Sequence, residues 1–252
     1  MKQINSIVYS LIVVCMLAVW SMAAFAVPEG PDSISRGQSA NGGGTNSGVQ
    51  QQTQGGNVTP VTLTHDTQTV RWQGFYGNVT GNISLSDNSG NSMYQWAMAT
   101  IQGEVYAVNQ SAAPIWTQVR CFNFTADTNQ NITLAELEGS LGMGATDVDG
   151  VNETFNLSFT GSFQVGTSIT ISSTSGCKRV ALNVDDAYQE SDFDVVILHD
   201  NTSNEAVIYT TVLEQDADNF KTGTETADFQ LIVGENGQVA TPTSYYFYVE
   251  LA

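Results

Sequence analysis

The chain has 252 residues, of which 25 are acidic and seven are basic, so its formal net charge at pH 7 is −18. A surface this acidic repels nucleic acids and anionic lipids, so we expect no nucleic-acid partner. With three cysteines and two histidines far apart, the chain also lacks the usual spacing of a zinc site.

The first 26 residues have the parts of a secretory signal peptide. Lys2 supplies a positive start, an apolar run extends from Ile7 to Trp20, and Ala24-Phe25-Ala26 fits the small-x-small cleavage pattern. We therefore predict a mature chain that starts at Val27 and is extracellular or on the cell surface. A retained membrane anchor is the alternative, but the run is slightly short for a span. No second apolar stretch is long enough to span a membrane, so we expect no span in the mature chain.

Residues 27–62 are rich in Gly, Ser, Asn, Gln and Thr and contain few apolar side chains. Such a segment buries too little apolar surface to offset the entropy lost on ordering, which predicts a flexible arm. An arm that orders on a neighbouring subunit as an added strand is the functional alternative. Residues 63–252 change to short alternating stretches, which predict one folded domain.

Short stretches of this domain alternate between apolar and polar side chains, and Gly, Asn, Asp and Ser separate them. Val79 to Leu85 and Phe155 to Phe159 each place apolar residues on one side, which predicts half-buried strands. The other candidate strands are 105–108, 119–124, 169–171, 180–184, 193–198, 207–212, 229–233 and 245–251. About ten short strands predict an all-β fold, an antiparallel β-sandwich.

One short helix is expected within this domain. Leu134, Leu137 and Leu141 fall at helical spacing. Thr133 precedes them, and Glu136 follows three residues later, which is a capping box.

Removal of the signal peptide leaves two cysteines, Cys121 and Cys177. In an oxidising exterior two lone cysteines usually pair, so we predict a disulfide between them. The loop from Cys121 to Cys177 holds more than fifty residues. Closing a loop of that length gives about 4 kcal/mol of stabilisation in the chain-entropy model.

The sequence is dense in N-x-S/T sequons, which accept N-linked glycans in exported proteins. The nine sites are Asn57, Asn78, Asn82, Asn109, Asn123, Asn131, Asn152, Asn156 and Asn201. Asn78, Asn82 and Asn156 lie opposite the apolar side of their predicted strands, where a glycan is accommodated. We predict that at least four of the sites carry glycan, while chance composition is the alternative for any single site.

Oxygen-bearing side chains between residues 127 and 138 recur at the spacing of a calcium loop. The candidate ligands are Asp127, Asn129, Asn131 and Glu138. Asp147 to Asp149 lie close downstream and would add further oxygens. Ile132 replaces the turn glycine of an EF-hand, so an ordinary Asx-rich loop is the alternative.

Three tryptophans, Trp72, Trp96 and Trp116, are candidates for a carbohydrate-stacking platform. Aromatic side chains are also preferred residues of strands and cores, which is the alternative interpretation of all three.

No nucleophile elbow, Walker loop or histidine pair for a metal is present in the sequence. His65 and His199 lie far apart, and the acidic residues between 185 and 194 are typical of a solvated loop. We therefore expect no catalytic residues.

Several stretches are specific beyond their composition. They are VPEGPDSI from Val27, WQGFYGNVTGNISLSD from Trp72, CFNFTA from Cys121, DVDGVNETF from Asp147 and TSYYFYVELA from Thr243. Through these stretches, and over nearly the whole mature chain, the sequence resembles a family of uncharacterised exported, mainly archaeal glycoproteins that are rich in Asn. The resemblance implies an extracellular archaeal glycoprotein and assigns no catalytic residue.

Together these features predict a secreted or cell-surface glycoprotein with a structural, adhesive or assembly role and no enzymatic activity. The expected partners are further copies of the chain or other cell-surface proteins, and calcium is the one cofactor that the residues suggest. An extracellular carbohydrate-binding module is the alternative, and a secreted hydrolase is less favoured.

Overall fold

The computed structural model describes residues 27–38, 54, 58, 60–61, 67–125, 130–202, 206–237 and 242–251. The predicted signal peptide and most of the predicted arm lie outside these residues. In the described part, antiparallel strands dominate and helix is scarce, which confirms the prediction of an all-β fold.

The elements follow one another along the chain as short segments. The first strands are β1 (Trp72–Gly77), β2 (Asn82–Ser86), β3 (Ser92–Ala97), β4 (Gly103–Val108) and β5 (Val119–Cys121). The helical elements are η1 (Trp116–Gln118), α2 (Leu134–Ser140) and α3 (Val151–Thr154). The remaining strands are β6 (Leu157–Ser158), β7 (Ser162–Val165), β8 (Ile169–Ser172), β9 (Lys178–Ala181), β10 (Asp194–Asp200), β11 (Val207–Val212), β12 (Ala217–Asp218), β13 (Thr226–Ala227), β14 (Phe229–Gly234) and β15 (Tyr246–Leu251).

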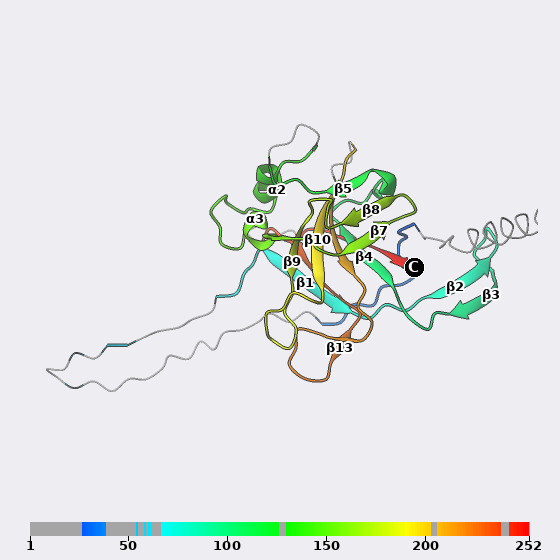
Figure 1. The fold of residues 1–252 in the computed structure, drawn as a ribbon, viewed down its shortest axis with the longest axis horizontal. Helices are drawn as coiled ribbons and strands as arrows, with labels where there is room; N and C mark the ends of the chain where they lie inside the picture. Colours follow the sequence, from blue (N-terminus) through cyan, green and yellow to red (C-terminus); the bar gives the residue numbers. More distant parts are fainter. Residues whose placement is uncertain are drawn as a thin grey trace, which may run out of the picture.

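A seven-stranded sheet forms the centre of the molecule (Figure 1). Its strands follow the order β15-β4-β11-β10-β9-β6, and β5 pairs with the end of β10. The middle strands β4, β11 and β10 are buried along nearly their whole length. Successive side chains of a strand point to opposite faces, so these strands have to be covered on both faces.

Each face of the central sheet has its own hydrophobic core. On one face, Tyr106 of β4 and Leu198 of β10 pack with Phe163 of β7. On the opposite face, Ile197 of β10 packs with β1, β14 and the two helices, including Leu137 of α2. The β7–β8 hairpin therefore covers one face and the β1–β14 pair with α2 and α3 covers the other, a layered, sandwich-like arrangement.

Most of the predicted elements are present. The strands predicted at 105–108, 169–171, 193–198, 207–212, 229–233 and 245–251 each match a strand of the structure to within a few residues. The capping box is confirmed, because Glu136 N–H donates to Thr133 Oγ1 at 3.2 Å and Thr133 N–H donates to Glu136 Oε2 at 2.8 Å. It opens α2 as expected.

The prediction of one strand from Phe155 to Phe159 is wrong in part. Phe155 ends helix α3, and only Leu157 and Ser158 pair as strand β6. Phe155 and Phe159 are nevertheless only 1% and 4% exposed. The predicted burial of these two side chains is therefore confirmed.

The predicted disulfide is confirmed: Cys121 bonds to Cys177 with the two Cα atoms 4.8 Å apart. It joins the end of β5 to the residue before β9, and both strands belong to the central sheet. The bond therefore ties together two strands whose chain positions are 56 residues apart.

The first residues of the predicted arm lie against the domain. Glu29 and Val249 exchange two backbone hydrogen bonds, of 3.1 and 2.8 Å, at the outer edge of β15. Pro28 beside them is buried. At this point the arm extends the edge of the central sheet.

Candidate functional site

The β2–β3 hairpin projects from the body of the molecule, to the right in Figure 1. Four apolar side chains lie on one side of it: Ile83 is paired with Trp96 across the strands, and Leu85 with Tyr94. They are 59%, 48%, 54% and 59% exposed, respectively. The rings of Tyr94 and Trp96 are in contact, with centroids 4.8 Å apart. We call these four residues the hairpin face.

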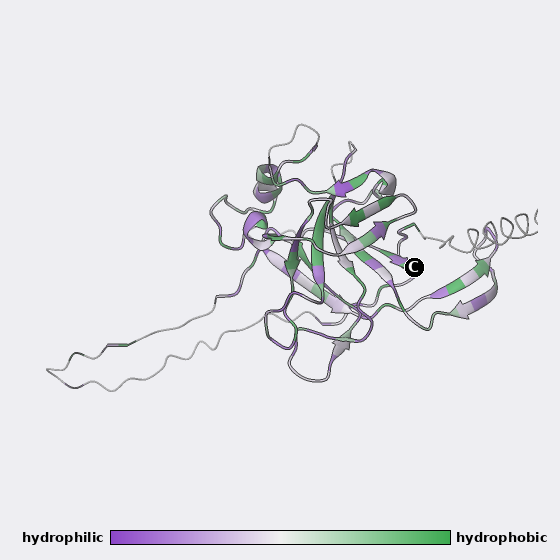
Figure 2. Ribbon diagram, in the orientation of Figure 1, coloured by the Kyte–Doolittle hydropathy of each residue, from purple (hydrophilic) through white to green (hydrophobic). Residues whose placement is uncertain are grey.

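The hairpin face corrects the prediction of a half-buried strand from Val79 to Leu85. Strand β2 begins only at Asn82, because the backbone before it turns away and Val79 N–H donates to Asp228 Oδ2 at 2.7 Å. Every residue of β2 and β3 is exposed, and green, apolar positions are visible on this outlying hairpin in Figure 2. An isolated two-stranded hairpin is marginally stable in water, and an exposed apolar patch usually marks an interaction site.

The other side of the hairpin is largely polar. Asn82 and Ser84 of β2 lie opposite Ala97 and Gln95 of β3. Asp87 is the only charged residue from 82 to 97. It sits in the turn, where hydrogen bonds from Asn91 and Ser89 lower its pKa. The hairpin is therefore amphipathic and almost uncharged in an otherwise acidic chain.

The structure does not bring the three candidate tryptophans together. Trp72 donates from Nε1 to the Asp149 carbonyl at 2.7 Å and belongs to the core on one face of the central sheet. Trp116 is 9% exposed and belongs to the core on the other face. Trp96 alone is exposed, on the hairpin face.

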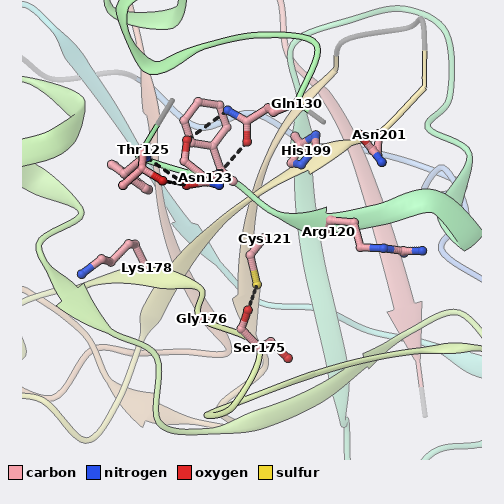
Figure 3. Close-up of a pocket in the computed structure, with 12 residues that line it drawn as sticks. Arg120, Cys121, Asn123, Thr125, Gln130, Ser175, Gly176, Lys178, His199 and Asn201 are labelled. Atoms are coloured by element: carbon pink, nitrogen blue, oxygen red, sulfur yellow. Dashed lines mark hydrogen bonds between the residues drawn. The ribbon is translucent and has the colours of Figure 1, made fainter. Parts of the chain in front are cut away.

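A pocket of about 480 Å³ lies beside the disulfide, and Figure 3 shows its lining. Gln130 fixes its wall, accepting from Asn123 N–H at 2.5 Å and donating to the Asn123 carbonyl at 3.1 Å. Arg120 and Lys178, two of the few basic residues, extend in opposite directions from the pocket (Figure 3). Their charges do not converge, so the pocket lacks the arrangement of an anion site. His199, also in the lining, is 4% exposed and its ring lies 6.2 Å from that of Phe122.

Two carboxyl groups face each other at one end of the central sheet. Glu104 of β4 is directly opposite Glu250 of β15, and the residues are 7% and 3% exposed. Burial, and then the charge of Glu250, raises the pKa of Glu104 to about 8. Burial also raises the pKa of Glu250, although N–H of Gly166 at 2.9 Å and the Tyr106 hydroxyl at 3.0 Å donate to it. The pair therefore retains a proton at neutral pH.

Sequence reasoning missed this pair, although a signal was present. Each glutamate interrupts an apolar strand, GEVYAV in β4 and YFYVEL in β15. A charged residue inside a strand that is otherwise apolar indicates a buried titratable group.

The acidic residues near 190 are only partly a solvated loop. Arg179 is 3% exposed and forms ion pairs with Asp194 and, at 3.0 Å, with Glu190. Asp185 and Asp186 are exposed and take positive φ angles of 50° and 58° in a turn. Two of these acidic residues, Glu190 and Asp194, therefore pair with the buried guanidinium of Arg179, and the two in the turn are exposed.

Most of the sequon asparagines are accessible in the structure. Asn78, Asn82, Asn131, Asn152, Asn156 and Asn201 are exposed, Asn109 and Asn123 are partly buried, and Asn57 lies outside the described residues. Exposure is what an attached glycan requires, so six sites are compatible with modification on this ground.

The predicted calcium loop is described only in part, because Asp127 and Asn129 lie outside the described residues. Asn131 is turned toward residue 202, since its Nδ2 donates to the Thr202 carbonyl at 2.5 Å. Glu138 is 5% exposed and accepts from Asn152 N–H at 3.2 Å. Within the described ranges, no three His, Cys, Asp or Glu side chains group as metal ligands. The hydrogen bond from Asn152 shows that the Glu138 side chain faces the start of α3.

Comparisons with known proteins add no relative: no family model, curated protein or solved structure matches this chain. In the part of the chain that the structure describes, no helix is long and apolar enough to cross a membrane. The site has to be interpreted from its own geometry.

Proposed function

We propose that this chain is an exported, N-glycosylated structural protein that associates with further copies of itself through the hairpin face. The observation that carries the proposal is the exposure of four apolar side chains together on a projecting hairpin. Water is a poor environment for such a surface, and a second hairpin face offers the same apolar chemistry.

The size of the hairpin face favours reversible assembly. Full burial of a large apolar side chain contributes about 1.5–3 kcal/mol, so four half-exposed ones contribute roughly 4 kcal/mol per hairpin. Two faces together supply roughly 8 kcal/mol, against an association cost of about 4–15 kcal/mol. Association through this face alone is therefore weak, and repeated contacts in a filament or matrix would strengthen it.

The distribution of charge and of sequons supports this contact. The formal charge of −18 makes most surfaces of two copies repel each other, whereas the hairpin has a single acidic residue. Asn82 lies on the polar side of β2, so a glycan there leaves the hairpin face open.

Export and glycosylation rest on separate features. The N-terminal cleavage pattern supports export, and the Cys121–Cys177 disulfide is typical of an oxidising exterior. The six exposed sequons support glycosylation, which the mass of the protein from its native cells tests directly: a mass equal to the bare polypeptide excludes it.

Sedimentation velocity over a wide concentration range tests assembly. The wild type should form oligomers as concentration rises, and Trp96→Ser with Leu85→Ser should remain monomeric. Met93→Ser is the matched control, because Met93 is 83% exposed on the same hairpin, where the register shift between Leu85 and Ser86 leaves it outside the cross-strand pairs of the hairpin face. Wild-type protein that is monomeric at every concentration refutes the proposal, as does equal dissociation by the control.

Carbohydrate binding is the second candidate, and one observation favours it: Trp96 and Tyr94 are exposed aromatic neighbours. Their planes meet at 65°, so they do not form one flat platform. A glycan array in which the wild type binds and Trp96→Ala does not would move the hairpin face from assembly to carbohydrate recognition.

A further inference from the structure

Three oxygen atoms converge on one glycine where α2 meets the turn before α3. A β-carbon at position 150 would lie 2.6 Å from Glu153 Oε2, 3.1 Å from the Asp147 carbonyl oxygen and 3.3 Å from Glu138 Oε1. The φ angle of Gly150 is −66°, a conformation open to any residue. Space, and not backbone conformation, is therefore what requires glycine at this point.

Two of the three oxygens belong to carboxylates that the chain leaves without a cation. Glu153 Oε1 accepts from Asn152 Nδ2 at 3.2 Å, whereas Glu153 Oε2 is buried and has no hydrogen-bond partner. Glu138 is 5% exposed, and the Asn152 N–H at 3.2 Å is the one hydrogen bond that its carboxylate accepts from the described residues. Neither glutamate takes part in an ion pair within the described part of the chain. Buried carboxylate oxygens normally accept a hydrogen bond or form an ion pair. The unpaired oxygen of Glu153 therefore favours a cationic ligand at this position.

Helix capping does not account for the arrangement. Glu153 is the third residue after the N-cap Gly150, where a capping glutamate accepts the N-cap N–H. That N–H instead donates to the Asp147 carbonyl at 2.9 Å. The orphaned Glu153 oxygen thus has no role in the cap.

The Asp147 carboxylate is already engaged elsewhere. Arg71 Nη2 lies 2.9 Å from its Oδ2, and Gly144 N–H donates to the same oxygen at 2.8 Å. The arginine charge is therefore neutralised by Asp147, and this residue presents only its main-chain oxygen to the two glutamates.

We propose that Glu138, Glu153 and the Asp147 carbonyl oxygen bind one divalent cation, Ca²⁺ by the chemistry of the ligands. All three are hard oxygen ligands, and Ca²⁺ lies about 2.3–2.6 Å from such oxygens in flexible geometry and completes its shell with water. Mg²⁺ demands a stricter octahedron and gives up its water reluctantly. The site retains Glu138 from the calcium loop predicted in the sequence, with two partners from the turn and helix downstream. It is independent of the hairpin face and of assembly.

A bound cation would join α2, the turn at 147–150 and α3, which together cover one face of the central sheet. With two carboxylates and one carbonyl, an affinity on the order of 10⁻⁴–10⁻³ M is expected, the range of extracellular calcium modules. Cation binding should raise the thermal midpoint, since the unfolded chain does not hold these oxygens together.

Terbium luminescence gives a readout specific to this corner. Tb³⁺ binds Ca²⁺ sites, and Trp72 donates from Nε1 to the Asp149 carbonyl at 2.7 Å, next to Gly150, so its indole should sensitise the bound ion. We expect saturable emission from the wild type that millimolar Ca²⁺ displaces. Trp72→Phe should greatly reduce the emission and keep the Ca²⁺ shift of the thermal midpoint.

Glu138→Gln and Glu153→Gln should each weaken Ca²⁺ binding at least tenfold in calorimetry, with the fold checked by circular dichroism. Glu138→Gln keeps an acceptor for the Asn152 N–H, so it removes charge while preserving that bond. Gly150→Ala should also block binding, whereas Gly139→Ala is the control, because a β-carbon there meets nothing within 4 Å.

Two results would overturn the site. One is a thermal midpoint of the wild type that is equal in Ca²⁺, in chelator and in NaCl of matched ionic strength. The other is a Ca²⁺ shift that survives undiminished in both glutamine variants, which would place the cation elsewhere on the acidic surface. If the two glutamine variants unfold, Tb³⁺ emission from Gly150→Ala equal to that of Gly139→Ala refutes the site on its own.

Discussion

Replacing Glu104 by glutamine should make the protein more stable at neutral and alkaline pH while leaving it almost unchanged at pH 5. The reason is the proton that the Glu104–Glu250 pair has to retain. A carboxyl that is 7% exposed beside a second carboxyl is neutral in the folded protein at pH values where the unfolded chain ionises it.

The sign follows from proton binding in the two states. The pKa of Glu104 is about 8 when folded against 4.5 for the free side chain, so between these values the folded state binds more protons. The contribution of Glu104 to stability is therefore fully present below pH 4.5 and is lost as pH rises to 8. At about 1.4 kcal/mol per pKa unit, the loss is about 3 kcal/mol at pH 7, about 4 kcal/mol at pH 8 and about 5 kcal/mol well above pH 8. The amide of the Glu104→Gln variant carries no charge at any of these pH values, so the variant escapes this loss.

Urea denaturation from pH 5 to pH 9 measures the effect, and thermal melts should show a difference of about 10 °C at pH 7 for a domain of this size. Glu225→Gln, a carboxyl at the surface, is the control and should follow the wild-type profile. Parallel pH profiles for wild type and Glu104→Gln would refute the reasoning. They would mean that Glu104 ionises in the folded state without cost.

Three further substitutions test the framework of the fold. Cys121→Ser with Cys177→Ser should cost about 4 kcal/mol in urea denaturation, because the disulfide closes a long loop; an unchanged midpoint would mean that the bond adds no stability. Arg179→Met should cost about 3 kcal/mol by leaving Asp194 without its cation, and Asp194→Asn in the same chain should restore part of it. Thr133→Ala should cost about 1 kcal/mol, whereas Thr133→Ser should keep the cap of α2; equal losses in thermal melts would count against the capping box.

The core strands could be predicted because most of their residues are apolar and nearly all are buried, so the run of apolar residues marks most of the strand. β4, β10 and β11 are runs of β-branched and aromatic residues, and such runs are typical of strands covered on both faces. Strand β1 was missed, since WQGFYG contains two glycines and lacks a clear alternation. It gains its place by pairing with β14, which is more than 150 residues away in the chain.

The stretch around Phe155 shows why the type of an element is harder to predict than its inward face. Val151 and Phe155 are four residues apart, as on a helix, and Phe155 and Phe159 are also four apart, which both periods place on one side. The turn at 147–150 decides in favour of helix for 151–154. The burial of Phe155 and Phe159 could therefore be predicted from the sequence, whereas the type of secondary structure could not.

The candidate cation ligands illustrate a related limit. Spacing along the chain favoured Asn131 as a neighbour of Glu138, but the Asn131 side chain bonds to residue 202. Glu153 lies fifteen residues beyond Glu138 and reaches the same glycine. A loop motif scores ligands by sequence position, whereas the packing of α2 against α3 determines which oxygens meet.

The hairpin face shows that an apolar pattern predicts a buried side of a strand without showing what covers it. Ile83 and Leu85 alternate with polar residues just as the residues of a covered strand do, so the sequence specifies an apolar partner for β2. In the described chain that partner is only Trp96 and Tyr94 of β3, and all four side chains stay about half exposed. An alternating apolar strand that the described part of the chain leaves in water has the character of an interaction surface, which is the basis of the assembly proposal. That is why the substitution of Trp96 and Leu85, compared with that of Met93, separates an assembly surface from a merely exposed hairpin.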